Sequence, residues 1–348
     1  MTLGPLMIDV AGTRLTAQEI KQLRDARVGG VILFSRNFEN MEQLRALVAG
    51  IHAVRSPPLL VSVDQEGGRI QRFRDGFSEL PAARWLGRRY EIDANEGKRL
   101  ARLSGWLMAA ELLDVGIDLS FAPVVDLDLG LSEVIGDRAF HKDAEVVASL
   151  AFAYMHGMRD AGMAAVAKHF PGHGAVVADS HLELPMDNRE HDAMSDDLVP
   201  YHRLVANGLQ GVMVAHVKYP QIDRRIASLS PYWLQTELRQ NLGFTGAIFS
   251  DDLNMSALEA IGDMSDRVKQ ALEAGADMAL ICNNPEAVAE TLAELGDIQD
   301  PVGQARVVAL RPHQVPWAGS RLQDTDQWKN AVSSLAGSTE RPPLELDG

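Results

Sequence analysis

The sequence predicts an α/β protein that folds as a single (β/α)8 barrel of the TIM type. Short apolar runs alternate with amphipathic helical stretches along the 348 residues, and most of the runs are too short and too rich in Val and Ile to be helices. No segment rich in Pro, Gly or Ser divides the chain, and no repeat of fixed period is present. A doubly wound open sheet shows the same alternation and is the rival fold.

Eight of the apolar runs read as strands of a parallel sheet that is buried on both faces. The predicted strands span residues 5–10, 28–34, 59–64, 117–126, 163–169, 211–217, 246–251 and 277–283. Helices are predicted at 16–27, 41–54, 99–114, 144–160, 195–207, 231–241, 264–274 and 285–295. The first helix opens with Thr16 and Glu19 at the spacing of a capping box. Eight strands with seven helical connections and a helical tail is the count of a barrel.

Polar or ionisable residues stand at the end of most predicted strands. In a barrel the carboxyl ends of all strands converge on one mouth, whereas an open sheet spreads them along an edge. This pattern favours the barrel and places candidate functional side chains together. The residues are Asp9, Asp64, Asp126, Lys168, His169, His216, Asp251 and Asn283.

We expect the barrel to occupy residues 1–311 and a polar, Pro-rich, partly irregular tail to occupy 312–348, on the surface. Lys and Arg number 33 and Asp and Glu 48, so the net charge is −15. Such an excess of acid repels a phosphate backbone, and no basic stripe offsets it. Nucleic acid is therefore excluded as a partner.

Neither a membrane span nor a secretory signal is predicted. No apolar run reaches about 18 residues, and the first residues lack a charged region followed by a long apolar one. Cys282 is the only cysteine, so no internal disulfide can form, which fits a reducing compartment. We expect a soluble, cytoplasmic protein in which Cys282 is a buried residue of the eighth strand without a catalytic part.

The first candidate motif is VDQEGGR at residues 63–69. Asp64 at a strand end followed by Gly67 and Gly68 predicts a tight turn into a helix, where backbone can approach a ligand closely. A plain turn with a capping Asp is the alternative. The motif matches neither GxGxxG nor GxxxxGK[ST], so a phosphate-binding loop is disfavoured.

The second candidate is KHFPGHG at residues 168–174, followed by Asp179 and His181. Two chemistries compete for this cluster. His169, His173 and His181, with Asp179, have the types of zinc ligands. Alternatively, Asp179 and His181 form a dyad in which the carboxylate fixes the tautomer of a general acid/base histidine. Lys168 beside His169 adds positive charge and is unfavourable for a metal.

The third candidate is GFTGAIFSDD at residues 243–252. A carboxylate at Asp251, at the strand end, can act as a nucleophile toward a sugar carbon, although metal binding and an acid/base pair also suit two carboxylates. Neighbours in a strand face opposite ways, so we expect one of Asp251 and Asp252 in the pocket and the other in a structural role, capping the next helix. Arg72 and Arg138 suit hydroxyls or a carboxylate, but spacing alone favours surface salt bridges.

These motifs, with AHV at 215–217, closely resemble those of the bacterial β-N-acetylglucosaminidases of glycoside hydrolase family 3, over about residues 5–300. The similarity is to the short, single-barrel, cytoplasmic form that works in peptidoglycan recycling, and KHFPGHG with DSH is its most specific element. The resemblance implies that Asp251 is the nucleophile and His181 the general acid/base, with Asp179 as its partner. It implies that N-acetylglucosamine is held by Asp64, Arg72, Arg138, Lys168 and His169.

The expected reaction removes non-reducing β-1,4-linked N-acetylglucosamine from anhydro-muropeptides, with retention and without a metal or other cofactor. Through the resemblance, the partner is then this small-molecule sugar, with neither nucleic acid nor membrane involved, and we expect a monomer. Two other hypotheses stay open. One is a zinc-dependent barrel hydrolase that uses His169, His173 and His181. The other is a catalytically silent sugar-binding protein, which needs Asp64 and Arg138 but no Asp–His dyad.

Overall fold

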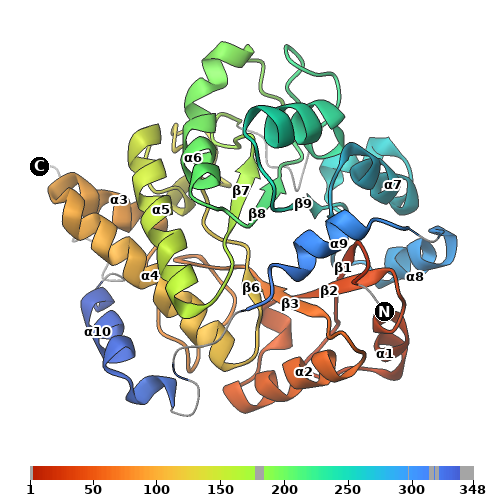
Figure 1. Ribbon diagram of the computed structural model, residues 1–348, viewed down its shortest axis with the longest axis horizontal. Helices are drawn as coiled ribbons and strands as arrows, with labels where there is room; N and C mark the ends of the chain where they lie inside the picture. Colours follow the sequence, from red (N-terminus) through yellow and green to blue (C-terminus); the bar gives the residue numbers. More distant parts are fainter. Residues whose placement is uncertain (1–2, 177–183, 297, 313–316, 318–320, 338–348) are drawn as a thin grey trace, which may run out of the picture.

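The eight predicted strands are all present and form one parallel sheet. The computed structural model describes residues 3–176, 184–296, 298–312, 317 and 321–337 (Figure 1). In spatial order the sheet runs β6-β3-β2-β1-β10-β9-β8-β7. The strands are β1 (Leu6–Asp9), β2 (Val28–Leu33), β3 (Leu60–Val63), β6 (Leu119–Ser120), β7 (Val166–Phe170), β8 (Gly211–Val214), β9 (Ala247–Asp252) and β10 (Met278–Ile281).

The two outer strands of this order, β6 and β7, meet along a seam that closes the sheet. Two parallel bridges, Ser120 with Ala165 and Val124 with Lys168, form the seam. The amide of Val125 also donates to the carbonyl of Lys168 at 2.8 Å. The closed seam confirms the predicted (β/α)8 barrel over the open sheet. The fourth strand is shorter than the predicted 117–126, since Pro123 has no N–H to give to a ladder.

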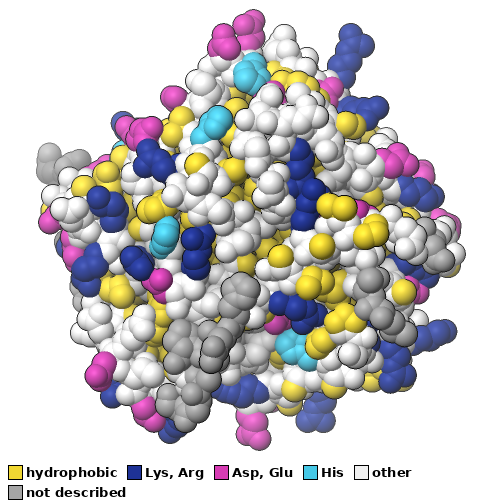
Figure 2. Space-filling model, in the orientation of Figure 1, with side chains coloured by type: hydrophobic (Ala, Val, Ile, Leu, Met, Phe, Trp, Pro, Cys, Tyr) yellow, Lys and Arg dark blue, Asp and Glu magenta, His cyan; other side chains and the backbone are white. Residues whose placement is uncertain are grey.

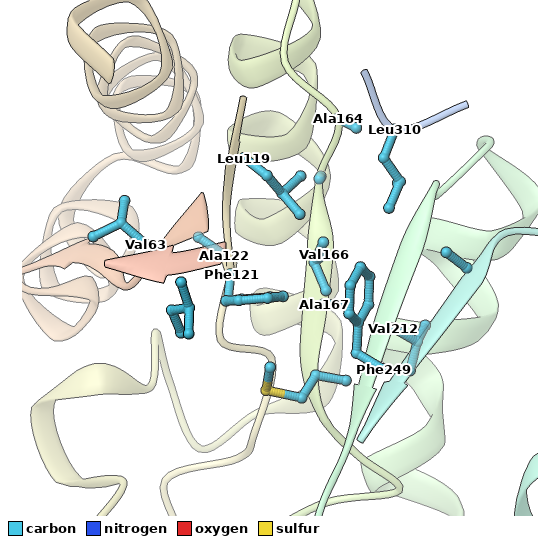
Figure 3. Close-up of a cluster of buried hydrophobic side chains, with 14 of the residues drawn as sticks. Val63, Leu119, Phe121, Ala122, Ala164, Val166, Ala167, Val212, Phe249 and Leu310 are labelled. Atoms are coloured by element: carbon cyan, nitrogen blue, oxygen red, sulfur yellow. The ribbon is translucent and has the colours of Figure 1, made fainter. Parts of the chain in front are cut away.

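Buried apolar side chains from opposite strands fill the barrel (Figure 3). Phe121 and Phe249 meet edge to face with ring centroids 5.2 Å apart. Helix α9 (Pro301–Val308) lies across the strands in Figure 1. Arg306 on this helix bonds Asp277 at 3.0 Å, directly before β10, and Leu310 beyond it is buried. The amino-terminal end of the barrel is therefore covered, and the opposite end remains for a site.

Helices surround the sheet at the predicted places. Thr16 and Glu19 form the expected capping box. The helices are α1 (Ala17–Leu23), α2 (Met41–Ala53), α3 (Ala83–Ile92), α4 (Ala94–Asp114), α5 (Ala144–Ala161), α6 (Ser195–Ala206), α7 (Met264–Ala274), α8 (Pro285–Glu294) and η5 (Tyr232–Asn241), which is of the π type. Short segments of 3-10 helix are η1 (Ser35–Asn37), η2 (Gly136–Arg138), η3 (His191–Met194), η4 (Ala227–Leu229), η6 (Ser256–Ile261) and η7 (Leu322–Asp324).

Two local predictions were wrong. The helix predicted to begin at residue 99 begins at Ala94, because Asp93 caps it, and α3 directly before it was not predicted. The GG motif does not turn directly into a helix. It closes a small antiparallel hairpin of β4 (Gln65–Gly67) and β5 (Ile70–Gln71), with positive φ at Gly67 and Gly68.

Beyond residue 311, the described part of the chain includes α10 (Asp326–Leu335), which packs on α4. The indole N–H of Trp328 donates to Glu111 at 2.8 Å. The boundary at 311 stays a prediction. Within the described ranges, no helix combines the length and the apolar character that crossing a bilayer requires. Figure 2 shows basic and acidic side chains interspersed on the visible face, with no continuous basic stripe.

Candidate active site

A cavity of about 180 Å³ opens at the carboxyl ends of the strands. Six of the eight residues to which the sequence analysis assigned a catalytic or sugar-holding role line it together: Asp64, Arg72, Arg138, Lys168, His169 and Asp251. His173, Cys282 and Asn283, which the sequence analysis also named, line it as well. Its other walls include Phe34, Glu66, Met213, Asp252 and Met255. The two predicted dyad residues, Asp179 and His181, lie outside the described residues.

Glu66 is the centre of an ion-pair network in this cavity. Its carboxylate lies 2.6 Å from Nζ of Lys168 and accepts two hydrogen bonds from Arg138, each of 2.8 Å. Lys168 also pairs with Asp64 at 2.7 Å. Burial raises the pKa of Glu66, but Arg138 and Lys168 outweigh it and hold the pKa well below the usual range. The carboxylate therefore stays ionised and keeps both cations charged.

The short hairpin explains how Glu66 reaches these partners. Glu66 lies on β4, and the positive φ angles of Gly67 and Gly68 turn the chain back within two residues. A Cβ atom on Gly67 would lie 2.4 Å from the carbonyl oxygen of Pro81. The two glycines are thus required by a close backbone approach.

The two arginines differ in their surroundings. The side chain of Arg138, on η2, is only 11% exposed, so its salt bridge with Glu66 is buried and the surface salt bridge that spacing favoured is wrong. Arg72 is half-buried, with Nη2 3.8 Å from the Asp64 carboxylate. Its guanidinium lies 5.8 Å from the centre of the Phe34 ring.

Asp126, a strand-end residue without an assigned role in the sequence analysis, orients His169. Its carboxylate lies 2.7 Å from Nδ1 of His169 and accepts the backbone N–H of His173, also at 2.7 Å. Burial raises the pKa of Asp126, but the charges of His169 and His173 lower it below its ordinary value. An ionised Asp126 accepts the proton on Nδ1 of His169, and the other ring nitrogen, Nε2, lies 3.5 Å from Nη2 of Arg138.

The side chains of Asp251 and Asp252, at the end of β9, have separate environments. Burial raises the pKa of Asp251, but His216, His169 and Lys168 lower it below the ordinary value, so Asp251 is ionised. Asp252 accepts backbone N–H bonds from Asn254 at 3.0 Å and Cys282 at 2.9 Å. These bonds give Asp252 a structural role, but it also lines the cavity, so the expectation that only one of the pair lies in the pocket was wrong. The expected helix cap was wrong as well, because Asp263 caps α7.

Two further residues, His216 and Cys282, lie near Asp251. His216 is fully buried, with Nδ1 2.6 Å from Oγ of Ser228 and Nε2 2.9 Å from the carbonyl oxygen of Asp252. Cys282 is buried as expected, immediately after β10, and burial raises the pKa of its thiol well above the ordinary value. Its thiol also lines the cavity, which was not anticipated.

The zinc hypothesis rests on three histidines, of which the structure describes two. His169 and His173 stack edge to face, with ring centroids 5.9 Å apart. Nδ1 of His169 is taken by Asp126. Within the described ranges, no three His, Cys, Asp or Glu side chains are arranged to hold a metal ion.

Glu66, Asp126 and His216 are the residues to which the sequence reasoning assigned no role. Glu66 directly precedes the two glycines of the first motif, and Asp126 and His216 stand at predicted strand ends. Their positions in the sequence are the features that could have indicated a place in the site. The sequence position of Glu66 does not identify its partners, because Arg138 and Lys168 are 72 and 102 residues away along the chain.

An ionised carboxylate at a strand end of a barrel, beside paired cations and carboxylates that suit hydroxyl groups, is compatible with a glycoside hydrolase. The chain belongs to glycosyl hydrolase family 3: the N-terminal domain of that family matches residues 5–309. A β-hexosaminidase from Thioalkalivibrio sulfidiphilus is 53% identical over 348 residues, the full length of both chains.

Solved structures agree with this assignment. Native NagZ from Neisseria gonorrhoeae is 42% identical, with a TM-score of 0.93 over 98% of this chain and 99% of that one. The same protein in complex with N-trifluoroacetyl-D-glucosamine matches with the same TM-score, identity and coverage. The relatives and the described fold therefore agree over nearly the whole chain.

Proposed function

We propose that this protein is a retaining β-N-acetylglucosaminidase that removes non-reducing β-1,4-linked N-acetylglucosamine from anhydro-muropeptides during peptidoglycan recycling. The observation that carries the proposal is the ionised carboxylate of Asp251 in the cavity at the barrel mouth. The β-hexosaminidase relatives and the glucosamine derivative bound by the Neisseria protein support an amino sugar as the substrate. In this proposal the enzyme works as a cytoplasmic monomer, without a metal or other cofactor.

The reaction has two displacements. Asp251 attacks the anomeric carbon while protonated His181 donates its proton to the leaving oxygen, which gives a covalent glycosyl-enzyme. Neutral His181, held by Asp179, then takes a proton from water, and the water oxygen replaces Asp251 on the sugar. An unperturbed histidine pKa of about 6.5 suits both roles near neutral pH.

The ion-pair network supplies the sugar-holding groups. Lys168 has three N–H donors and uses two on Asp64 and Glu66, so one remains for a sugar hydroxyl. Asp64 keeps acceptor capacity beside Arg72. His169 presents Nε2 next to Arg138. Because each charge of this network already has a partner of opposite sign, the network suits a neutral sugar.

Covalent trapping tests the proposal. We expect an activated 2-deoxy-2-fluoro glucoside, in which fluorine replaces the acetamido group, to label Asp251, located by mass spectrometry of peptides, and expect no label in the Asp251→Asn variant. Label on another residue would overturn the nucleophile assignment. Release of N-acetylglucosamine from a purified anhydro-muropeptide tests the substrate, and binding of the sugar without cleavage would support the silent sugar-binding protein instead.

A further inference from the structure

The carboxylate of Asp251 is held by the residue that follows it in the chain. The backbone N–H of Asp252 donates to Oδ1 of Asp251 at 2.8 Å. Both residues stand at the end of β9, which lies between β8 and β10 in the sheet. The position of the Asp251 carboxylate in the cavity therefore depends on how firmly Asp252 itself is held.

On one side, β10 and the residue after it fix the end of β9. The carboxylate of Asp252 accepts the backbone N–H of Cys282 at 2.9 Å and that of Asn254 at 3.0 Å. The N–H of Leu253 donates to the carbonyl oxygen of Leu280 on β10 at 2.9 Å. The side chain of Asp252 and the next peptide group are thus bound to backbone atoms.

On the other side, a histidine ring holds the carbonyl group of Asp252. His216 follows the end of β8 by two residues, and its side chain is fully buried. Its Nε2 lies 2.9 Å from the carbonyl oxygen of Asp252. A carbonyl oxygen only accepts hydrogen bonds, so Nε2 carries a proton and donates it. Asp252 is therefore held from both neighbouring strands.

A second buried side chain orients the imidazole. Nδ1 of His216 lies 2.6 Å from Oγ of Ser228 on η4, and Ser228 is also fully buried. The backbone N–H of Ser228 donates to Ala215 at 3.2 Å, and that of Ala227 donates to Val217 at 2.9 Å. The 3-10 segment is thus bound to the residues on either side of His216. Because both ring nitrogens have partners, the orientation of the ring is fixed.

We propose that His216, with its ring oriented by Ser228, is a positioning residue for the nucleophile: it holds the carbonyl group of Asp252 and so keeps in place the N–H that binds Asp251. Neither His216 nor Ser228 is among the described residues that line the cavity, so they act through the backbone of β9. The proposal rests on the proposed function. It adds to it a pair of residues that controls attack by Asp251 but not sugar binding.

Three variants change this contact to different extents. His216→Leu removes both ring nitrogens and leaves the buried carbonyl of Asp252 without this donor, which favours a shift of the strand end. His216→Gln keeps an N–H for the carbonyl and an oxygen that can accept from Ser228. Ser228→Ala keeps the imidazole but removes the group that orients it.

The expected losses follow from these differences. Small misplacement of a reacting group costs up to about a hundredfold in rate. We expect kcat/KM to fall by about tenfold or more in His216→Leu and by about threefold or more in Ser228→Ala. His216→Gln should lie between His216→Leu and the wild type.

Two further measurements separate loss of attack from other losses. Attack is common to all substrates, so 2,4-dinitrophenyl and phenyl N-acetyl-β-glucosaminides should lose kcat/KM equally, within about twofold. Labelling by the 2-deoxy-2-fluoro glucoside should slow by a similar factor. The inhibition constant of free N-acetylglucosamine should change by less than about twofold, because the groups assigned to the sugar stand on other elements.

Ser62 provides a matched control. Its side chain is also fully buried, and its hydroxyl donates to the carbonyl oxygen of Val31 at 3.2 Å. It lies on β3, which pairs with β2 and β6 and not with β9. Ser62→Ala removes the same atom as Ser228→Ala, so it should keep wild-type kinetics on both glycosides even if its Tm is lower.

The outcomes are distinct. Equal losses on both glycosides, with unchanged sugar binding, partial recovery in His216→Gln and no effect in Ser62→Ala, support the proposal. A greater loss on the phenyl substrate, a weaker affinity for N-acetylglucosamine, or equal losses in His216→Leu and His216→Gln would overturn it.

Wild-type kinetics in Ser228→Ala would also overturn it, whether or not the His216 variants fold. Failure of the proposed function looks different, because it concerns the wild type. A wild-type protein that cleaves neither glycoside, or that takes the label on a residue other than Asp251, would overturn the proposed function and the positioning role with it.

Discussion

Glu66 and Arg138 form a buried, two-pronged ion pair in which both hydrogen bonds measure 2.8 Å. The same carboxylate holds Lys168 at 2.6 Å. One anion therefore orients the two cations that the proposed function assigns to the sugar. The positions of Arg138 and Lys168 therefore depend on Glu66, whose role in the proposed function is to remain ionised and hold both cations.

Replacing Glu66 by Gln should weaken sugar binding and stability together. The variant leaves two buried cations with Asp64 as the remaining carboxylate, and loss of one partner from a buried pair costs about 3–5 kcal/mol. We expect a lower Tm and a fall in kcat/KM of at least about tenfold, mainly through KM. Steady-state kinetics and thermal unfolding check this. Glu133→Gln, at an exposed residue on the loop that leads to Arg138, should match wild type, and an unchanged KM in Glu66→Gln would contradict the assignment.

Asp126→Asn should reduce activity by disturbing His169. The amide of Asn can donate toward Nδ1, which would move the ring proton to Nε2 and point it at the Arg138 guanidinium. We expect kcat/KM to fall by about a hundredfold, as for comparable losses of a partner that orients a histidine. Asp118→Asn is the control, because Asp118 pairs with His52 at 3.0 Å at the opposite end of the barrel. Equal kinetic losses in both variants would point to a general packing effect.

The stability of the protein should depend on Asp252 between pH 4 and pH 7. Burial and the charge of Asp251 raise the pKa of Asp252 from 3.8 to about 7, so the folded state binds a proton that the unfolded state has released. This contribution to stability is fully present below the unfolded pKa and is lost as the pH rises through about 7. The loss amounts to at most about 4 kcal/mol.

Asp252→Asn should flatten this dependence, since the amide oxygen still accepts from Asn254 and Cys282 but does not ionise. Urea denaturation at pH 5, 6, 7 and 8 measures the free energy of unfolding for both proteins. Parallel curves for wild type and variant would show that Asp252 is not the group responsible.

Removal of metals should leave the activity unchanged. The proposed reaction uses Asp251 and His181 without a metal. Dialysis against a chelator should therefore keep kcat/KM on an aryl N-acetyl-β-glucosaminide within about twofold of the untreated enzyme. Activity that disappears with the chelator and returns with zinc would favour the hydrolase that uses His169, His173 and His181 as ligands.

The barrel was predictable because its strands are buried on both faces. The run 28–34 is continuously apolar, and within 59–63 only Ser62 is polar, a pattern that depends on local sequence alone. The strand-end positions of Asp64, Lys168 and Asp251 likewise follow from where each run stops. For that reason the sequence placed six site residues in one cavity.

The remaining features depend on tertiary contacts. The β4–β5 hairpin arises because the backbone at Gly67 approaches Pro81, which no local pattern records. The spacing of Arg138 suggests a surface residue. In the structure it is buried, because the ion pair with Glu66 offsets the free-energy cost of burying its charge. Helix α4 begins at Ala94 because Asp93 caps it. A prediction from the spacing of apolar residues takes no account of such a polar cap.

The seam between β6 and β7 has a consequence for how the enzyme meets its substrate. Among the described residues, two bridges and three backbone hydrogen bonds close the barrel there, and the groups that the proposed function assigns to the sugar stand on either side of it. Arg138 follows β6, whereas Lys168 and His169 belong to β7. A sugar held by all three spans the joint between the two edges of the sheet. Binding of the sugar and closure of the barrel are then thermodynamically linked. A bound sugar stabilises the pairing of β6 with β7.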